Sequence, residues 1–479
     1  MVEYARPIRS INPERRIAAL FLFFLLSFSS LRFIPGLFYT SEIWFVLVFL
    51  YLVMSYLPEK LNVGFKNCTF ENYGISLLIY VPLVGPIMAN SEFGQPWIYG
   101  FLAQREIVLV GCMLMFLHSY RKQWFSLIDV ERALLLLAWV TLVLFTLAKI
   151  IFVPDHFNAY IPTFVTGGVG TDNQFKFEIN FIIFGFYYYA FSAYRENSAK
   201  FLFLSLPFFI YMVHGPGSRL RIFVSIICYL FLIVRWGNVK KTLIFIPKMV
   251  LLITLLLPVF FIVHKGNNSS VITRNNSSVI TRNNSSVITR NNSSVITRNN
   301  SSVITRIGDS DGVLAYVSSI PAIQKIIAAF KVVTTGKEGS DPSANARISE
   351  SKIALPYVRR HWVLGNGTIS NKWKGGYKSL LGYFYPSDIG LLGVLYLYGV
   401  LGLLIFAYQF RFALRYSKLL SNIRGRYINL TSAVKGFLLF YAVSSLVTGQ
   451  FVGSVEQGLI MIAILYCAAQ AEGHGLRGC

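Results

Sequence analysis

Long apolar runs separated by short polar segments dominate the chain. Twelve runs can be marked, at 17–35, 42–57, 73–90, 97–119, 133–153, 178–194, 200–215, 219–235, 244–264, 388–410, 432–450 and 455–471. About 20 apolar residues suffice for an α-helix to cross the hydrocarbon core of a bilayer. Strand-like alternation is not evident. The pattern therefore predicts an all-α polytopic membrane protein with about twelve transmembrane helices.

Composition supports this class. The 479 residues are 54% hydrophobic and only 14% charged, with a mean hydropathy of +0.56, whereas about 25% of residues are charged in soluble domains. The basic N-terminus followed by an apolar run resembles a signal peptide, but no small-residue cleavage site follows it. We therefore expect an uncleaved first helix.

The basic residues predict how the helices are oriented. Twenty Lys and Arg residues fall in the short segments on one predicted side, from Arg6 to Arg477, against only Lys176, Arg219 and Arg221 on the other. Short cytoplasmic loops are the ones enriched in Lys and Arg. Both termini are thus predicted to be cytoplasmic. The net charge of +23 is interpreted as a topology signal, and no nucleic-acid partner is expected.

One long polar segment, 265–387, separates nine predicted helices in 1–264 from three in 388–479. The orientation predicts that this segment is a loop on the outer, periplasmic side of the membrane. Residues 267–306 repeat NNSSVITR five times, which is typical of a tolerated insertion at a loop tip; alternatively, the number of copies tunes an activity. The segment carries sixteen Lys and Arg residues against five Asp and Glu residues. Such a loop should attract anionic ligands.

The sequence lacks the common nucleotide-binding and metal-binding motifs. The sequence has no P-loop, no GxGxxG, no HExxH and no CxxC pair. We therefore expect neither a metal site nor a cofactor, and chemistry must come from arginines, carboxylates and histidines.

Three places carry such groups, each with two interpretations. Arg219 and Arg221 begin a predicted helix on the outer side, where they either reach lipid headgroups or bind an anion. Asp388 opens the tenth predicted helix as an N-cap or as a general base. Arg105 and Glu106 lie within a predicted span, either in ion pairs with each other or with neighbouring helices, or on the wall of a cavity.

Several stretches together resemble a known family. GPGSRLRIF at one helix end, a large loop containing NARISESKIALPYVRRHWVLGNGTIS, and PSDIGLLGVLYLYGVLG are similar to the O-antigen polymerases of the Wzy type and their relatives, the O-antigen ligases. Arg347 matches the family's loop arginine, 365–367 its G-x-G, and Gly399 with Gly402 its glycine pair. Ligases usually place a histidine where this chain has Asp388, which favours a polymerase.

The resemblance implies a glycosyltransferase of the bacterial inner membrane, inverting and metal-independent. Donor and acceptor would be glycans on undecaprenyl pyrophosphate, and a chain-length regulator is a possible partner besides membrane lipids. The implied catalytic residues are Asp388 as base, Glu350 as its alternate, and Arg347. The implied substrate-binding residues are Arg219, Arg221, Arg359, Arg360, His361 and Arg105, although His361 does not match the ligase histidine position.

Two rival functions stay open. An O-antigen ligase would differ only in its acceptor, lipid A-core. A flippase or transporter of lipid-linked oligosaccharides would also have twelve spans, but it should show corresponding broken helices in two halves, and the sequence shows no such symmetry.

Overall fold

The structure is a computed structural model of the chain, and it describes eight stretches: 12–28, 38–63, 69–151, 179–214, 219–236, 342–420, 427–448 and 454–472. By its contacts the chain divides into two units, Met1–Leu232 with Asn345–Cys479, and Ile233–Ala344. Nearly all described residues belong to the first unit, which is the subject below. The NNSSVITR repeats and the predicted ninth span at 244–264 lie outside the described residues.

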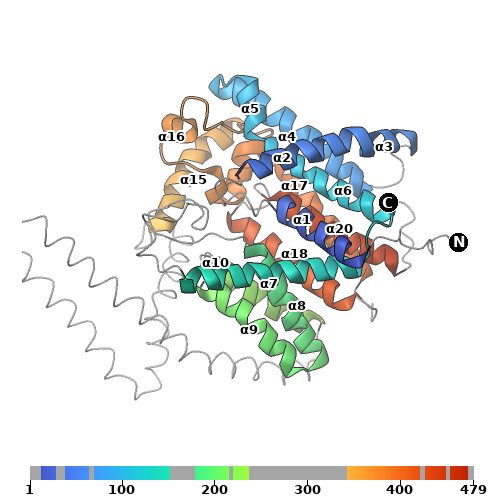
Figure 1. The fold of residues 1–479 in the computed structure, drawn as a ribbon. Helices are drawn as coiled ribbons and strands as arrows, with labels where there is room; N and C mark the ends of the chain where they lie inside the picture. Colours follow the sequence, from blue (N-terminus) through green and yellow to red (C-terminus); the bar gives the residue numbers. More distant parts are fainter. Residues whose placement is uncertain are drawn as a thin grey trace, which may run out of the picture. The chain divides into compact units, whose positions relative to one another are not determined.

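In these stretches the chain is all-helical and contains no strand (Figure 1). The α-helices are α1 Pro13–Ser27, α2 Phe38–Tyr51, α3 Leu57–Val63, α4 Thr69–Phe93, α5 Trp97–Ala103, α6 Val110–Arg121, α7 Leu127–Ile151, α8 Ile179–Glu196, α9 Ala199–His214, α10 Arg219–Trp236, α15 Pro342–Arg360, α16 Gly376–Leu381, α17 Leu391–Leu419, α18 Ile428–Thr448 and α20 Val455–Ala471. A π-helical segment, η2 Leu52–Tyr56, joins α2 to α3. The short 3₁₀ segments are η4 Arg105–Leu109 and η6 Pro386–Ile389.

The predicted all-α class is confirmed for this part of the chain. The predicted apolar runs that fall in the described stretches are helical, although the run at 97–119 is divided among α5, η4 and α6. By length and composition, three helices could cross a membrane: Glu42–Glu59, Thr69–Phe93 and Leu391–Leu419. Helix α5 and the segment after it, bent by 47°, would make a fourth. The described part of the chain is therefore all-helical with several long apolar helices, as in a membrane-embedded protein, while the count of twelve spans stays a prediction.

Helix α20 lies at the centre of the packing. Every residue from Val455 to Ala469 is buried, and the helix packs against α6, α17 and α18. A helix that is apolar nearly all round is found either in a protein core or in a membrane span. This explains why the apolar C-terminal run is a core element.

Helix α2 and its continuation have the opposite character. Large apolar side chains are exposed on it, namely Ile43, Val46, Leu47, Phe49, Leu50, Val53 and Met54. Exposed apolar surface of this extent is unfavourable in water and is normally covered by a partner or by lipid. This surface agrees with the membrane-embedded class.

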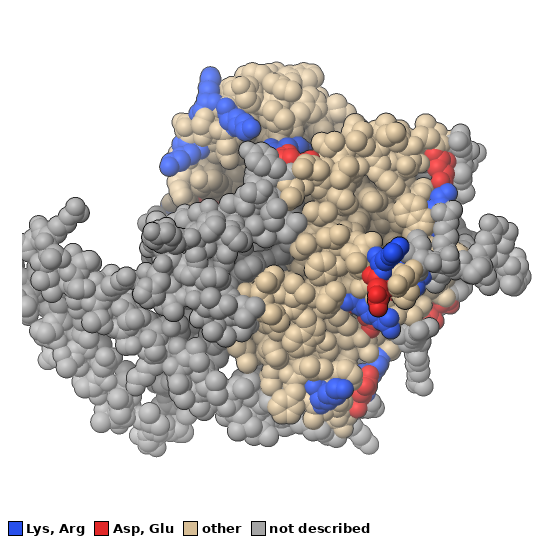
Figure 2. Space-filling model, viewed as in Figure 1, with Lys and Arg blue, Asp and Glu red and all other residues tan. Residues whose placement is uncertain are grey.

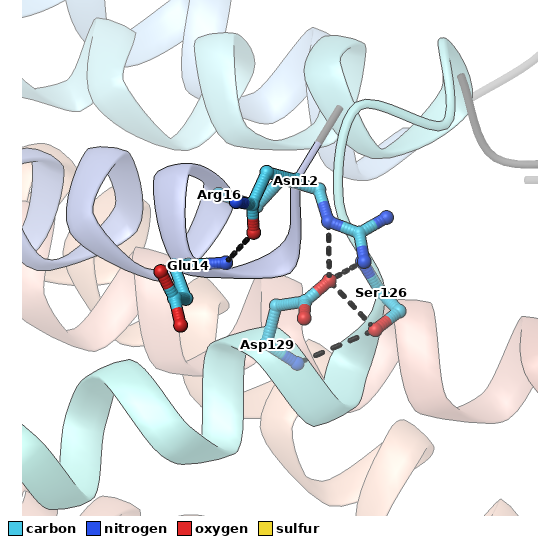
Figure 3. Close-up of polar contacts among 5 residues, drawn as sticks. All are labelled: Asn12, Glu14, Arg16, Ser126 and Asp129. Carbon is cyan, nitrogen blue, oxygen red and sulfur yellow. Dashed lines mark hydrogen bonds and ion pairs between the residues drawn. The ribbon is translucent and has the colours of Figure 1, made fainter. Parts of the chain in front are cut away.

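Polar contacts fix the start of α1 to the start of α7 (Figure 3). The Asn12 side chain caps α1 by accepting a hydrogen bond from the backbone N–H of Glu14 at 3.0 Å. Asp129 accepts bonds from the backbone N–H and the hydroxyl of Ser126 at 2.9 and 2.8 Å. The same carboxylate pairs with Arg16 at 3.4 Å. One buried acid therefore holds two helix starts together.

Candidate functional site

Glu350, on α15, is the most unusual acid of the predicted site. Its side chain is 1% exposed, yet among the described residues neither carboxyl oxygen has a hydrogen-bond partner. Arg347 lies one turn earlier on the same helix, where side chains three residues apart are neighbours. Buried carboxyls are normally hydrogen-bonded because leaving one without a partner is costly. An exception of this kind is typical of functional sites.

The surroundings of Glu350 bring its pKa close to neutrality. Burial disfavours the charged form and the negative charge of Asp388 adds to this effect, so that the pKa rises from 4.5 to about 7. The nearby backbone N–H of Tyr385 and the charge of Arg347 oppose the rise in pKa. The Tyr385 N–H is close to the carboxyl but does not meet the geometry of a hydrogen bond. A carboxyl with such a pKa can both accept and release a proton near pH 7.

Asp388 lies in η6 and is exposed. Helix α17 begins after Gly390, and its start has no side-chain cap. The interpretation of Asp388 as the N-cap of this helix is therefore wrong. Instead its carboxylate accepts a weak bond from the Ser387 hydroxyl at 3.4 Å and lies close enough to Glu350 to raise the pKa of that residue. Two carboxyls of unequal burial thus share one site, the arrangement that divides acid and base roles.

The three basic residues at the end of α15 differ in their surroundings. Arg359 is exposed. Arg360 pairs with Glu92, at the end of α4, with 2.8 Å between Nη1 and Oε1. His361 Nε2 lies 2.7 Å from the other oxygen of Glu92. Glu92 thus links α15 to α4, although its position just after a predicted apolar run gave little reason to single it out.

We expect Glu92→Gln to loosen the end of α15. The substitution removes the charge that bonds Arg360 and His361, and hydrogen bonds to charged groups contribute about 1.5–3 kcal/mol. Local opening should therefore become roughly tenfold or more frequent, and trypsin should cut after Arg359 and Arg360 correspondingly faster in the purified protein. Glu196→Gln, which breaks an exposed pair with Arg195, is the control, expected to cost about 0.5 kcal/mol or less. Equal cleavage in both variants would contradict the linking role of Glu92.

Residues 362–367, which contain the predicted G-x-G, lie against a break in α17. At Gly399 the backbone leaves the helical region, with φ 63° and ψ −167°. The N–H groups of Asn366 and Gly367 donate to the carbonyls of Tyr396 and Leu397 at 2.7 and 3.0 Å. These are carbonyls that a continuous helix would pair with the N–H groups four residues later.

Those later N–H groups are satisfied as well. Val400 donates to the carbonyl of Trp362 at 2.8 Å, and Leu401 donates to that of Val363 at 3.1 Å. The loop therefore replaces two helical hydrogen bonds with four of its own. Non-helical backbone is tolerated at such a place because each freed polar group finds a partner.

Other contacts hold this loop on α4 and on the short connection that follows it. The buried Gln95 amide donates to the carbonyl of Thr368 at 3.1 Å and accepts from the N–H of Ser370 at 2.7 Å. A Cβ on Gly367 would lie 2.1 Å from the carbonyl oxygen of Gly85 on α4. Close backbone approach of this kind requires glycine. The G-x-G therefore fits between two helices.

Arg105 lies just after a break rather than inside one straight span, because α5 ends at Ala103 and the chain bends there. Its guanidinium makes a bidentate contact with Glu42 of α2, at 2.9 and 3.0 Å from Nε and 2.7 Å from Nη2. Of the predicted alternatives, pairing with a neighbouring helix is thus observed. A substrate-binding role for Arg105 stays a prediction.

Arg219 and Arg221 lie in the first turn of α10, but the structure does not describe their side chains. Their predicted role in binding substrate therefore stays a prediction. In the part of the chain that is described, no group of three or more His, Cys, Asp or Glu side chains could hold a metal ion.

Basic side chains gather over α16 (Figure 2). Lys372, Lys374 and Lys378 are all exposed, and the Lys374 ammonium lies 4.9 Å from the centre of the Trp373 ring. The sequence contains no Asp or Glu between Glu350 and Asp388. In the sequence, the two carboxyls are therefore separated by a segment whose charged side chains are all basic.

No model of a known protein family matches the chain, and comparison with curated protein sequences finds no relative.

Proposed function

We propose that the chain is an O-antigen polymerase of the Wzy type, joining undecaprenyl-pyrophosphate-linked repeat units on the outer face of the bacterial inner membrane. The observation that carries the proposal is Glu350, a buried carboxyl with a pKa of about 7 beside Arg347 and Asp388. It supports proton transfer next to an arginine, which glycosyl transfer from a pyrophosphate needs. The motif resemblance and the apolar helices support the same family.

In this mechanism Glu350 takes the proton from the attacking sugar hydroxyl. The hydroxyl oxygen bonds to the anomeric carbon of the donor as the bond from that carbon to the pyrophosphate breaks, and undecaprenyl pyrophosphate leaves with the electron pair. Arg347 neutralises the leaving group, joined by Arg219 and Arg221. Asp388 keeps the pKa of Glu350 high enough for the base to act near pH 7.

A flippase or transporter is the second candidate, and the broken helices favour it. The chain bends by 47° after α5, and α17 is interrupted at Gly399. Discontinuous helices at a binding site are typical of transporters. The polymerase is preferred because the quoted motifs resemble those of polymerases and because transport alone gives no reason for a long basic loop on the outer side.

Arg347→Ala in the source bacterium separates these functions. As a polymerase variant it should lose the ladder of long O-antigen chains on a lipopolysaccharide gel while keeping the band with one repeat unit. Removing one charge contact to a leaving group should slow transfer by about 100-fold or more. Lys352→Ala, an exposed cation on the same helix, is the control and should keep the ladder. Loss of the single-unit band as well would point to a ligase or a flippase, and an unchanged ladder would contradict the site.

A further inference from the structure

Residues 383–385 alternate between the surface and the core. Phe384 is fully buried, with its ring 4.9 Å from that of Tyr396. Tyr383 and Tyr385 are 63% and 39% exposed. Phe384 thus anchors the segment in the core, while the tyrosines on either side of it are exposed.

The backbone holds this arrangement from both ends. Gly382 turns the chain with a φ of 79°, and Tyr385 is extended, with φ −133° and ψ 107°. Pro386 is buried, and α17 packs so closely on it that a Cβ on Gly393 would lie 1.7 Å from its carbonyl oxygen. The two exposed rings, 5.4 Å apart and at 82° to each other, are therefore presented by a fixed segment.

This pair of rings adjoins the carboxyl site. The backbone N–H of Tyr385 is one of the groups that act on Glu350, and the next exposed residues are Ser387 and Asp388. The surface thus offers, in order, two aromatic rings in an edge-to-face pair, a hydroxyl and a carboxylate. Aromatic rings that are exposed together beside a polar site are typical of a surface that a ligand covers.

We propose that Tyr383 and Tyr385 form a sugar-binding platform that seats a pyranose ring of the glycan next to Glu350. A sugar ring has an apolar face of C–H groups that suits the electron-rich face of an aromatic ring, and a rim of hydroxyls that Ser387 and Asp388 can bond. The platform takes a neutral ring, whereas the lysines over α16 suit an anion. This inference rests on the proposed function, since a glycan substrate is assumed.

The test is binding of the purified full-length protein, in lipid nanodiscs, to an array of bacterial surface glycans. The wild type should bind, and Tyr383→Ala with Tyr385→Ala should weaken binding at least tenfold. Phe at both positions keeps the rings and should retain most of the binding. Trp97→Ala removes an exposed aromatic at the start of α5 and is the matched control. Glu350→Gln should still bind, because it alters proton transfer and not the platform.

Failure of the platform and failure of the polymerase are distinguishable. If the wild type binds no glycan, or if the double alanine variant binds as well as the wild type, the platform is wrong even where Glu350→Gln abolishes the polymer ladder. In that case the tyrosines are interfacial residues that face lipid headgroups. If binding depends on the two rings while Glu350→Gln leaves the ladder intact, the platform stands and the catalytic role of Glu350 fails.

Discussion

Glu350→Gln is expected to lower the rate of polymerisation by about 10²- to 10⁴-fold, the usual contribution of a positioned general base. Glutamine has nearly the same shape but cannot take the proton from the sugar hydroxyl. The measurement is chain growth by the purified protein from lipid-linked repeat units. In the wild type the rate should rise with pH through about 7, the pKa of Glu350, and then level off. The residual rate of the variant should show no such rise.

The same substitution should stabilise the fold. The pKa of Glu350 is raised by folding, from 4.5 to about 7, so the folded wild type holds its proton more tightly than the unfolded chain. Wild-type stability therefore falls as pH rises from 4.5 to 7 and is constant above that range. Glutamine does not ionise. Above pH 7 the free energy of unfolding of the variant should therefore exceed that of the wild type by about 3 kcal/mol, at about 1.4 kcal/mol per pKa unit.

Thermal unfolding of both proteins at pH 5 and pH 8 measures this difference. Glu14→Gln, at an exposed acid that begins α1, is the control and should change neither rate nor stability. A variant that is inactive but more stable at pH 8 identifies Glu350 as functional rather than structural, because active-site groups often cost stability. An inactive variant that is also less stable at pH 8 would contradict this, as would an active one.

The helices were largely predictable because apolar runs of membrane length are a strong local signal. Their interruptions were not. Nothing in the apolar run around Gly399 marks that glycine as a break in the helix. The break depends on hydrogen bonds with residues about thirty or more positions earlier, since the Trp362 carbonyl accepts from Val400 and the Asn366 N–H donates to Tyr396. The bend after α5 falls at three polar residues within the predicted run 97–119, namely Gln104, Arg105 and Glu106. The charges of Arg105 and Glu106 were noted in the sequence, but the bend was not predicted.

The sequence named candidate site residues but not their arrangement. It gave Glu350 only as the alternate base, and Asp388 with its helix-opening position was the preferred one. The structure reverses their environments, because the segment from Tyr385 to Asp388 lies against Glu350 and leaves Asp388 in solvent. Glu92 escaped notice for the same reason: its partners on α15 are distant in sequence.

Gly399→Ala is expected to be among the most destabilising single substitutions in the described part of the chain. Its φ of 63° lies in the left-handed region, where a side chain costs about 1–2 kcal/mol. In addition, an alanine Cβ would lie 2.2 Å from the carbonyl oxygen of Val363, so the loop must move and weaken the hydrogen bonds that fill the break. Overpacking adds about 1–3 kcal/mol, giving a loss of about 2–5 kcal/mol.

Gly382→Ala is the matched control, and Gly365→Ala is the second substitution of a double-mutant cycle with Gly399→Ala. Gly382 has a φ of 79°, but no other group lies within 4 Å of the place that a Cβ would take, so Gly382→Ala carries only the conformational cost. Gly365→Ala, with its Cβ 2.5 Å from the backbone of Leu397, disrupts the same contact from the loop side. Thermal unfolding should show a large loss for each of Gly399→Ala and Gly365→Ala, a small one for Gly382→Ala, and a double variant less destabilised than the sum, because both changes break one contact. Additive losses, or a Gly399→Ala protein as stable as Gly382→Ala, would mean that the loop does not hold the broken helix together.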